Sequence, residues 1–187
     1  MRARHLLLPL LLLLGACQSP PPRPDFDPGR DFAAYRSWSW QEPGLQFQPD
    51  DPRLRSDLTE QRIRGAIAQQ LEQRDLRPTA SANGADLRVQ AWWIVDNRQE
   101  QVSTQIGGAW GDPWRGGFWG GPGYVETRSL DYQVATLQID LFDARDGQLV
   151  WRGSAEQLLN RRQSSPQQRE AAIQALVARI LSQYPPH

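Results

Sequence analysis

The chain has 187 residues, and its 21 basic residues balance 21 acidic ones, so the formal net charge is zero. Nucleic-acid-binding domains usually carry a basic stripe, and this balance argues against a nucleic-acid partner. All the basic residues are arginines, and the chain holds one cysteine and two histidines, so few of the common catalytic and metal-binding side chains are present.

The first 17 residues are typical of a bacterial targeting sequence that ends at the only cysteine. A basic head at residues 2–5 precedes Leu6 to Leu14, an apolar run interrupted by Pro9. The run is too short to span a hydrocarbon core, which needs about 20 residues, and it fits a secretory signal. Because it closes on Leu14-Gly15-Ala16-Cys17, the segment resembles the bacterial lipobox.

The lipobox resemblance implies that Cys17 is the lipidation site. It implies transfer of a diacylglyceryl group to the Cys17 sulfur, cleavage after Ala16 and acylation of the freed amine. Two or more acyl chains anchor a protein stably to a bilayer. Gln18, rather than aspartate, follows the cysteine, which by the same resemblance points to the outer membrane with the body facing the periplasm. The alternatives are an ordinary signal peptide with a chance cysteine and an uncleaved membrane helix.

Removal of residues 1–16 leaves a chain whose only histidine is His187, the last residue. A Ser-His-Asp arrangement or a His/Cys zinc site therefore cannot be assembled in the ordinary way. With Cys17 lipidated, no disulfide forms, and stability depends on a packed core, for which this length suffices. We expect no metal and no cofactor, and we expect a protein that is not an enzyme.

After the leader, residues 17–30 form a proline-rich tether and residues 31–187 a single domain. Tyr35 to Trp40 alternates aromatic and polar residues and predicts a half-buried strand, followed by a loop over residues 41–53. A helix is expected over residues 55–75, opened by a capping box of Asp57 and Glu60.

Four further strands and a second helix follow in the predicted order. Asp86 to Val95 alternates apolar with polar or tryptophan residues, and a separate strand is expected over residues 99–106. The chain resumes at Val125, and residues 134–155 predict a hairpin that turns at Gly147 with positive φ. The last helix begins with a Ser165–Gln168 capping box. These elements predict an α+β two-layer sandwich, a mostly antiparallel sheet of about four or five strands with two helices on one face.

Several short motifs occur together in this order. They are Asp31-Phe32, Tyr35 to Trp40, Ala85-Asp86-Leu87, Leu149 to Ser154 and Tyr184-Pro185-Pro186. Behind a lipobox, this set resembles the bacterial envelope lipoprotein family catalogued as domain of unknown function 4136, over roughly residues 25–186. The resemblance implies a small envelope lipoprotein and supplies no catalytic residues, because the family has no assigned activity.

A loop rich in glycine and proline, residues 107–124, carries five aromatic side chains. They are Trp110, Trp114, Phe118, Trp119 and Tyr124. The composition is unsuited to a regular strand, and exposed aromatic groups usually mark a contact surface. The loop is predicted to enter a membrane interface, stack on envelope sugars or dock a partner protein. The alternative is a disordered hairpin end whose rings fold back on the sheet.

Two groups of acidic residues are candidate sites. Asp140, Asp143 and Asp146 recur every third residue before a glycine, which does not match a calcium loop and predicts a solvated turn. Asp140 paired with Glu156 or Asp86 would be the carboxylate pair of a glycosidase.

A third group is basic. Arg161, Arg162 and Arg169 predict either a solvated face or a contact with anionic lipid or lipopolysaccharide phosphate.

These observations predict a lipid-anchored, non-enzymatic module on the periplasmic side of the outer membrane. Its expected partners are the membrane, through the lipid on Cys17, and an envelope protein or glycan, bound through the exposed sheet face or residues 107–124. The alternative is a module that binds peptidoglycan or lipopolysaccharide, or a carboxylate-based glycosidase.

Overall fold

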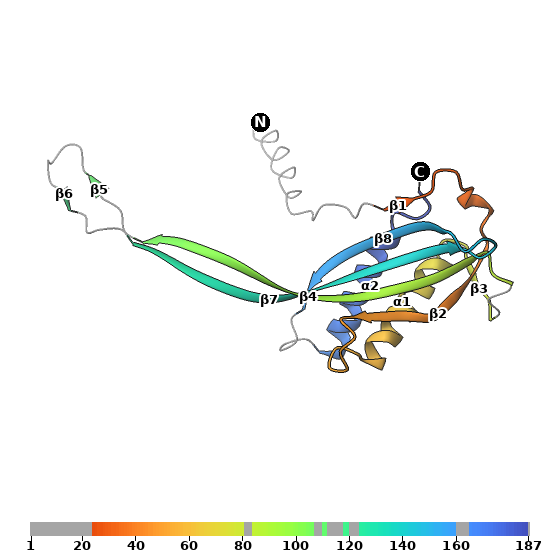
Figure 1. Cartoon of the computed structure of the whole chain (residues 1–187), viewed down its shortest axis with the longest axis horizontal. Helices are drawn as coiled ribbons and strands as arrows, with labels where there is room; N and C mark the ends of the chain where they lie inside the picture. Colours follow the sequence, from red (N-terminus) through yellow and green to blue (C-terminus); the bar gives the residue numbers. More distant parts are fainter. Residues whose placement is uncertain are drawn as a thin grey trace, which may run out of the picture.

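The computed structural model describes residues 24–80, 84–106, 110–111, 118–119, 124–159 and 165–186. Cys17 and Trp114 lie outside the described residues. Two helices lie on one face of a six-stranded sheet whose strand order is β1-β8-β7-β4-β2-β3 (Figure 1). The elements are β1 Asp25–Phe26, η2 Phe32–Ala34, β2 Ser37–Gln48, α1 Asp57–Glu72, β3 Arg77–Pro78, β4 Leu87–Ile106, β5 Trp110–Gly111, β6 Phe118–Trp119, β7 Tyr124–Asp143, β8 Leu149–Leu158 and α2 Pro166–Leu181.

The α+β class is confirmed, whereas the predicted number of four or five strands needs correction. The main sheet has six strands and is mixed, because β2 runs parallel to both β4 and β3. α1 lies between β2 and β4 in the chain, and such a crossover returns the chain to the same end of the sheet. β1 and β3 are two-residue edge strands, too short to give a periodic pattern.

β2 extends through residues that the sequence analysis placed in a loop. Its register with β4 shifts between Trp40 and Leu45, at the point where Pro43 and Gly44 interrupt the alternation. Proline and glycine are tolerated in a strand at such an irregularity. The strand then resumes its pairing from Leu45 to Gln48, so the predicted loop over residues 41–53 is wrong in its first eight residues.

Both helices begin close to where the sequence places them. Ser56, not Asp57, is the N-cap of α1, and its side chain accepts a hydrogen bond from the Thr59 backbone N–H. The capping box of Ser165 and Gln168 at the start of α2 is confirmed, with the Ser165 N–H donating to Gln168 Oε1 at 2.7 Å. The buried positions of α1 and α2 face the sheet and one another.

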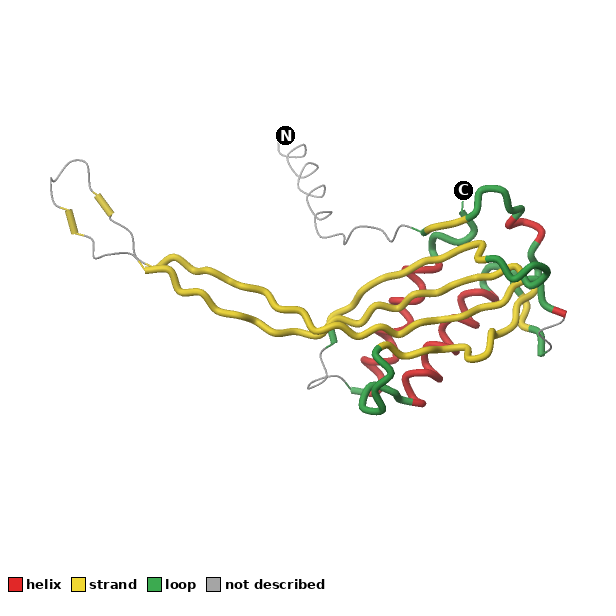
Figure 2. The backbone as a smooth tube through the Cα atoms, in the orientation of Figure 1, coloured by secondary structure: helices red, strands yellow, loops and turns green. Residues whose placement is uncertain are grey.

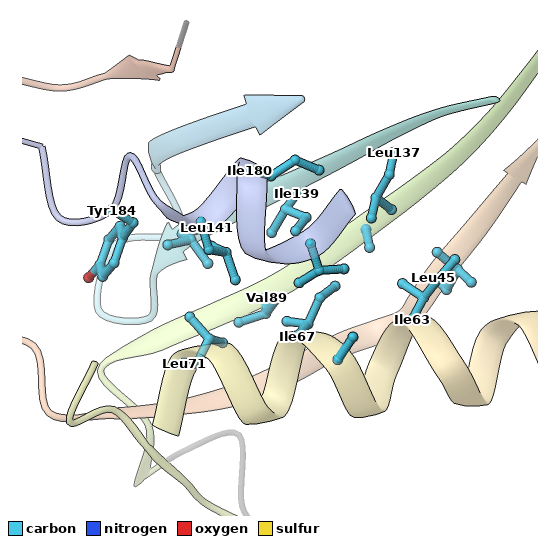
Figure 3. Packing of buried hydrophobic residues seen from close by; sticks show 14 of the residues in the cluster. Leu45, Ile63, Ile67, Leu71, Val89, Leu137, Ile139, Leu141, Ile180 and Tyr184 are labelled. Carbon is cyan, nitrogen blue, oxygen red and sulfur yellow. The ribbon is translucent and has the colours of Figure 1, made fainter. Parts of the chain in front are cut away.

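The core fills the space between the sheet and the two helices (Figure 3). The alternation predicted for residues 87–95 is confirmed, because the odd-numbered side chains from Leu87 to Val95 are buried. Leu137, Ile139 and Leu141 lie opposite them on β7 and are buried on the same face. The turn after β7 has Gly147 at φ 74°, as predicted, so the hairpin of β7 and β8 is confirmed.

Candidate functional site

Half of the β4–β7 ladder projects beyond the rest of the sheet (Figure 2). The pairing of β2 with β4 ends at Gln48 and Ile94, and that of β8 with β7 ends at Leu158 and Val134. Ten further pairs, from Asn97↔Gln133 to Ile106↔Tyr124, continue as a two-stranded ribbon. At a rise of about 3.3 Å per residue, this ribbon reaches roughly 30 Å from the domain. We call residues 97–106 and 124–133 the arm, and residues 107–123 the tip.

The prediction of a separate strand over residues 99–106 is wrong. These residues continue β4 without a break. The apolar alternation fades after Val95 because no helix covers the ribbon, so neither face selects for apolar side chains. The sequence pattern therefore ends where the core ends, although the strand goes on.

The two faces of the arm differ in chemistry. One face carries Arg98, Glu100 and Val102, opposite Tyr132, Leu130 and Arg128 on β7. Val102 is 41% and Leu130 53% exposed. The other face is mostly uncharged, and there the Ser103 and Thr127 hydroxyls lie 3.2 Å apart. By register, the charged and apolar face of the arm is continuous with the face of the sheet opposite the helices.

The predicted aromatic contact residues that the structure describes lie at the outer end of the arm. β5 and β6 pair there, with Trp110 opposite Trp119 and Gly111 opposite Phe118 in the backbone register. The prediction that this composition holds no strand is wrong for these two short strands. Tyr124 begins β7 opposite Ile106.

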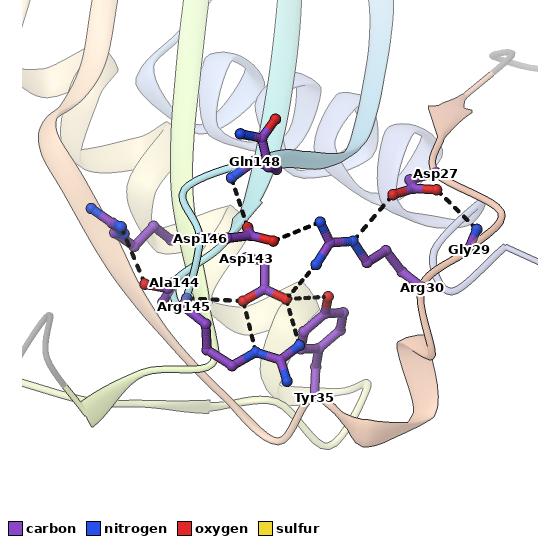
Figure 4. A network of polar contacts seen from close by, with 10 residues as sticks. Asp27, Gly29, Arg30, Tyr35, Asp143, Ala144, Arg145, Asp146 and Gln148 are labelled. Carbon is purple, nitrogen blue, oxygen red and sulfur yellow. Dashed lines mark hydrogen bonds and ion pairs between the residues drawn. The ribbon is translucent and has the colours of Figure 1, made fainter.

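A second arrangement of polar residues surrounds Asp143 at the other end of the sheet (Figure 4). Its fully buried carboxylate accepts hydrogen bonds from Arg30 Nη1 at 3.0 Å, from Tyr35 OH at 3.0 Å and from Arg145 Nη2 at 2.6 Å. The Arg145 guanidinium holds the pKa of Asp143 well below its usual range. Burial, followed by the bond to Asp143, raises the pKa of Tyr35.

This cluster is structural and was not predicted. Arg30 also forms ion pairs with Asp27 and Asp146, at 3.1 and 2.8 Å. The predicted tether, which includes Arg30, is therefore bound at its end to the turn between β7 and β8. The expected solvated turn is therefore wrong for Asp143. No spacing in the sequence links Arg30 or Tyr35 to Asp143, because they are more than a hundred positions apart.

The carboxylates considered for a glycosidase have separate partners. Asp140 is 1% exposed and forms a bidentate pair with Arg152, at 2.7 and 2.8 Å. Glu156 pairs with Arg98. Asp86 accepts from the backbone N–H of Arg36 and from Ser37, and the bond from Arg36 is the main cause of its lowered pKa.

Asp140 and Glu156 are also separated along the sheet. Asp140 is opposite Arg152, four residues before Glu156 on β8, a separation of about 13 Å along the strand.

Among the described residues, no group of three or more His, Cys, Asp or Glu side chains could hold a metal ion. Within the same part of the chain, neither helix has the length and hydropathy needed to cross a bilayer. Arg161 and Arg162 lie outside the described residues, and Arg169 is exposed in the first turn of α2.

Solved structures are similar to this chain at low sequence identity. A PDZ domain protein from Parabacteroides distasonis is 17% identical with a TM-score of 0.51, and the match covers 89% of this chain and 36% of that one. A DUF4136 family protein from Bacteroides thetaiotaomicron is 17% identical with a TM-score of 0.49, covering 88% and 95% of the two chains. PelC from Paraburkholderia phytofirmans, solved as a dodecamer, is 14% identical with a TM-score of 0.44, covering 86% and 94%.

No curated protein matches the sequence. A family model described as Domain of unknown function (DUF4136) matches residues 22–186. The match includes all of the described residues and confirms the resemblance to this family drawn from the motifs. The chain therefore belongs to the DUF4136 family.

Proposed function

We propose that the protein is a lipid-anchored module on the periplasmic side of the outer membrane that binds an envelope component through the end of its arm. The projecting arm carries this proposal. A two-stranded ribbon without a covering layer is marginally stable in water, and its open edges are ready to pair with another chain. Ten pairs of ribbon beyond the core therefore favour a role in contact outside the domain.

The residues at the end of the arm support a contact role. Tryptophan and tyrosine contribute most to binding where they are buried by a partner. The tip contains three tryptophans and a phenylalanine, and the chain enters and leaves the tip at the outer end of the arm, where Ile106 and Tyr124 are opposite one another. The face opposite the helices, continuous with the arm, offers the partner further surface.

A binding role is favoured over hydrolysis by the state of the carboxylates. A glycosidase keeps one carboxyl free to donate a proton and another free to attack or activate water. Asp140 and Glu156 are instead each held by an arginine. We therefore propose a module that is not an enzyme.

The anchor is proposed to be the lipid on Cys17. Mass spectrometry of the native protein should find Cys17 as the first residue, carrying the mass of a diacylglyceryl group and an amide-linked acyl chain. In a polyproline II conformation, the chain from Cys17 to Asp25 would span about 25 Å. A bare thiol, or residues 1–16 still attached, would contradict the proposed location.

Shortening the tip should abolish the complex with the envelope partner without unfolding the domain. Ile106 and Tyr124 are opposite one another, so Asn-Gly in place of residues 107–123 would close the arm with a two-residue turn. After crosslinking in native membranes, we expect recovery of the partner with this variant to fall at least tenfold.

A matched variant separates the aromatic rings from the length of the tip. It keeps all residues of the tip and changes Trp110, Trp114, Phe118 and Trp119 to serine. Both variants should lose the partner while the thermal unfolding temperature stays within about 2 °C of wild type, since no described core contact is removed. Undiminished recovery with either variant would show that the rings of the tip do not make the contact.

A carbohydrate is the second candidate for the envelope component. The aromatic composition of the tip favours it, because an aromatic side chain offers a flat apolar face on which a sugar ring can stack. Retention of the protein on isolated peptidoglycan or lipopolysaccharide, reduced by Trp110→Ala, would favour this candidate. Partner capture with no retention on either glycan would favour a protein.

A further inference from the structure

A pocket of about 480 Å³ lies on the helical side of the domain, near the base of the arm, where the lining residue Leu159 donates a backbone hydrogen bond to Gln133. Ser56 and Thr59 contribute from the start of α1, and Gln168 and Arg169 from the start of α2. Trp93 of β4 and the end of β8 line it as well, together with Arg53 and Leu54 before α1. The volume is within the usual range for small-molecule sites, about 300–1,000 Å³.

The pocket combines an apolar wall with a cationic rim. Leu54, Trp93 and Ile173 supply apolar surface. Arg53, Arg62 and Arg169 are its charged side chains, and no carboxylate is among the described lining residues. A ligand that matches both parts has an apolar body and a negative charge.

Arg62 is the best placed of the three cations to hold a ligand. Its side chain is 17% exposed and, among the described residues, makes one ion pair, from Nε to Glu170 Oε2 at 3.3 Å. A guanidinium has five N–H donors, so others remain to bind an anion. A partly desolvated arginine interacts with an anion more strongly than an exposed one.

The other two cations are more exposed. Arg53 is bound to Asp51 at 2.6 Å, and its side chain is 88% exposed. Arg169 lies on the open first turn of α2. The positive ends of both helices lie at the same rim and add to the attraction for an anion.

We propose that this pocket binds a small free amphiphile with one anionic group, such as a short-chain carboxylate or phosphate ester. The apolar body would lie against Trp93 and Ile173, and the anionic group would accept hydrogen bonds from Arg62. The pocket is small and concave, which favours a free molecule over a lipid held in a bilayer. The inference does not depend on the arm, so the variants of the tip should bind the same ligand unchanged.

Calorimetry with the full mature chain carrying Cys17→Ser tests the proposal in the absence of detergent. Octanoate should bind saturably at one site per chain. Octanol, which has the same apolar body without the charge, should bind at least tenfold more weakly, and inorganic phosphate should show no saturable binding. Absence of saturable octanoate binding, or equal binding of octanol, would overturn the proposal. If the protein binds phosphatidylglycerol vesicles and does not bind octanoate, its ligand is a bilayer surface and the proposal is overturned.

Two variants locate the site. Arg62→Gln should weaken octanoate binding at least tenfold, whereas Arg128→Gln, which removes the same charge from the arm, should leave it unchanged. If Arg62→Gln unfolds, Arg169→Gln serves instead, because Arg169 is exposed, and at least a threefold loss is expected. Equal affinity in the wild type and in the folded pocket variant would contradict the assignment.

Discussion

Gly153→Ala is expected to lower the free energy of unfolding by about 3 kcal/mol, the upper end of the usual cost of overpacking a core. Gly153 is on β8 where α2 crosses the sheet, and it is buried. A Cβ atom there would overlap the Trp151 ring and approach Ile180 Cγ2 to 2.9 Å. Trp151 is itself fully buried, so neither neighbour has room to move.

Thermal unfolding measures this effect, with Gly65→Ala as the matched control. Gly65 is exposed on α1, and a Cβ atom there has no neighbour within 4 Å. Gly153→Ala should lower the unfolding temperature by about 10 °C. Gly65→Ala should raise stability by about 1 kcal/mol, because alanine favours a helix over glycine. Similar unfolding temperatures for Gly153→Ala and wild type would show that α2 does not pack so closely on β8.

Asp143→Asn is expected to cost about 3 kcal/mol at neutral pH, as for the loss of one partner in a buried ion pair. Asp143 is buried between two arginines and Tyr35. An amide cannot neutralise these arginines, and it presents donors where the site needs acceptors. Denaturant unfolding at pH 7 gives the difference directly.

Asp51→Asn is the control, because Asp51 pairs with an arginine that is exposed. Exposed pairs contribute about 0–1 kcal/mol. Equal effects of Asp51→Asn and Asp143→Asn would mean that the cluster around Asp143 does not stabilise the fold.

The same cluster makes stability depend on acid pH. Because the pKa of Asp143 is lowered in the folded protein, its contribution is complete above the unfolded pKa of about 3.9 and is lost as pH falls toward the folded value. Wild type should therefore lose more stability than Asp143→Asn between pH 5 and pH 2. Parallel pH profiles for the two proteins would contradict this assignment.

The sequence predicted those elements whose side chains alternate between core and solvent. Residues 87–95 are such a case, and the helix cap at Ser165 and the turn at Gly147 have chemistry that is local in the chain. The predicted first strand ends too early, at Trp40, because Pro43 and Gly44 taken in isolation indicate a turn. The parallel pairing of β2 with β4 depends on the path of α1, which no local pattern records.

Of the two candidate sites, the sequence predicted one and not the other. The aromatic composition of residues 107–124 singled out the tip, but the arm that carries it has no apolar alternation to predict it. The buried carboxylate of Asp143 was missed because its partners Arg30 and Tyr35 come from the other end of the chain. Contacts of such long sequence separation appear only in the folded structure.

Photo-crosslinking in intact cells tests the proposed role of the arm most directly. A photoreactive residue would replace Thr104 on the arm, Ser154 on the sheet face opposite the helices, or Gln69 on the outer side of α1, all of which are exposed. The proposal predicts a discrete crosslinked product from Thr104 and none from Gln69, with a product from Ser154 if the partner extends along the sheet. Products from Gln69 with none from Thr104 would show that the envelope contact lies on the helices and that the arm does not make it.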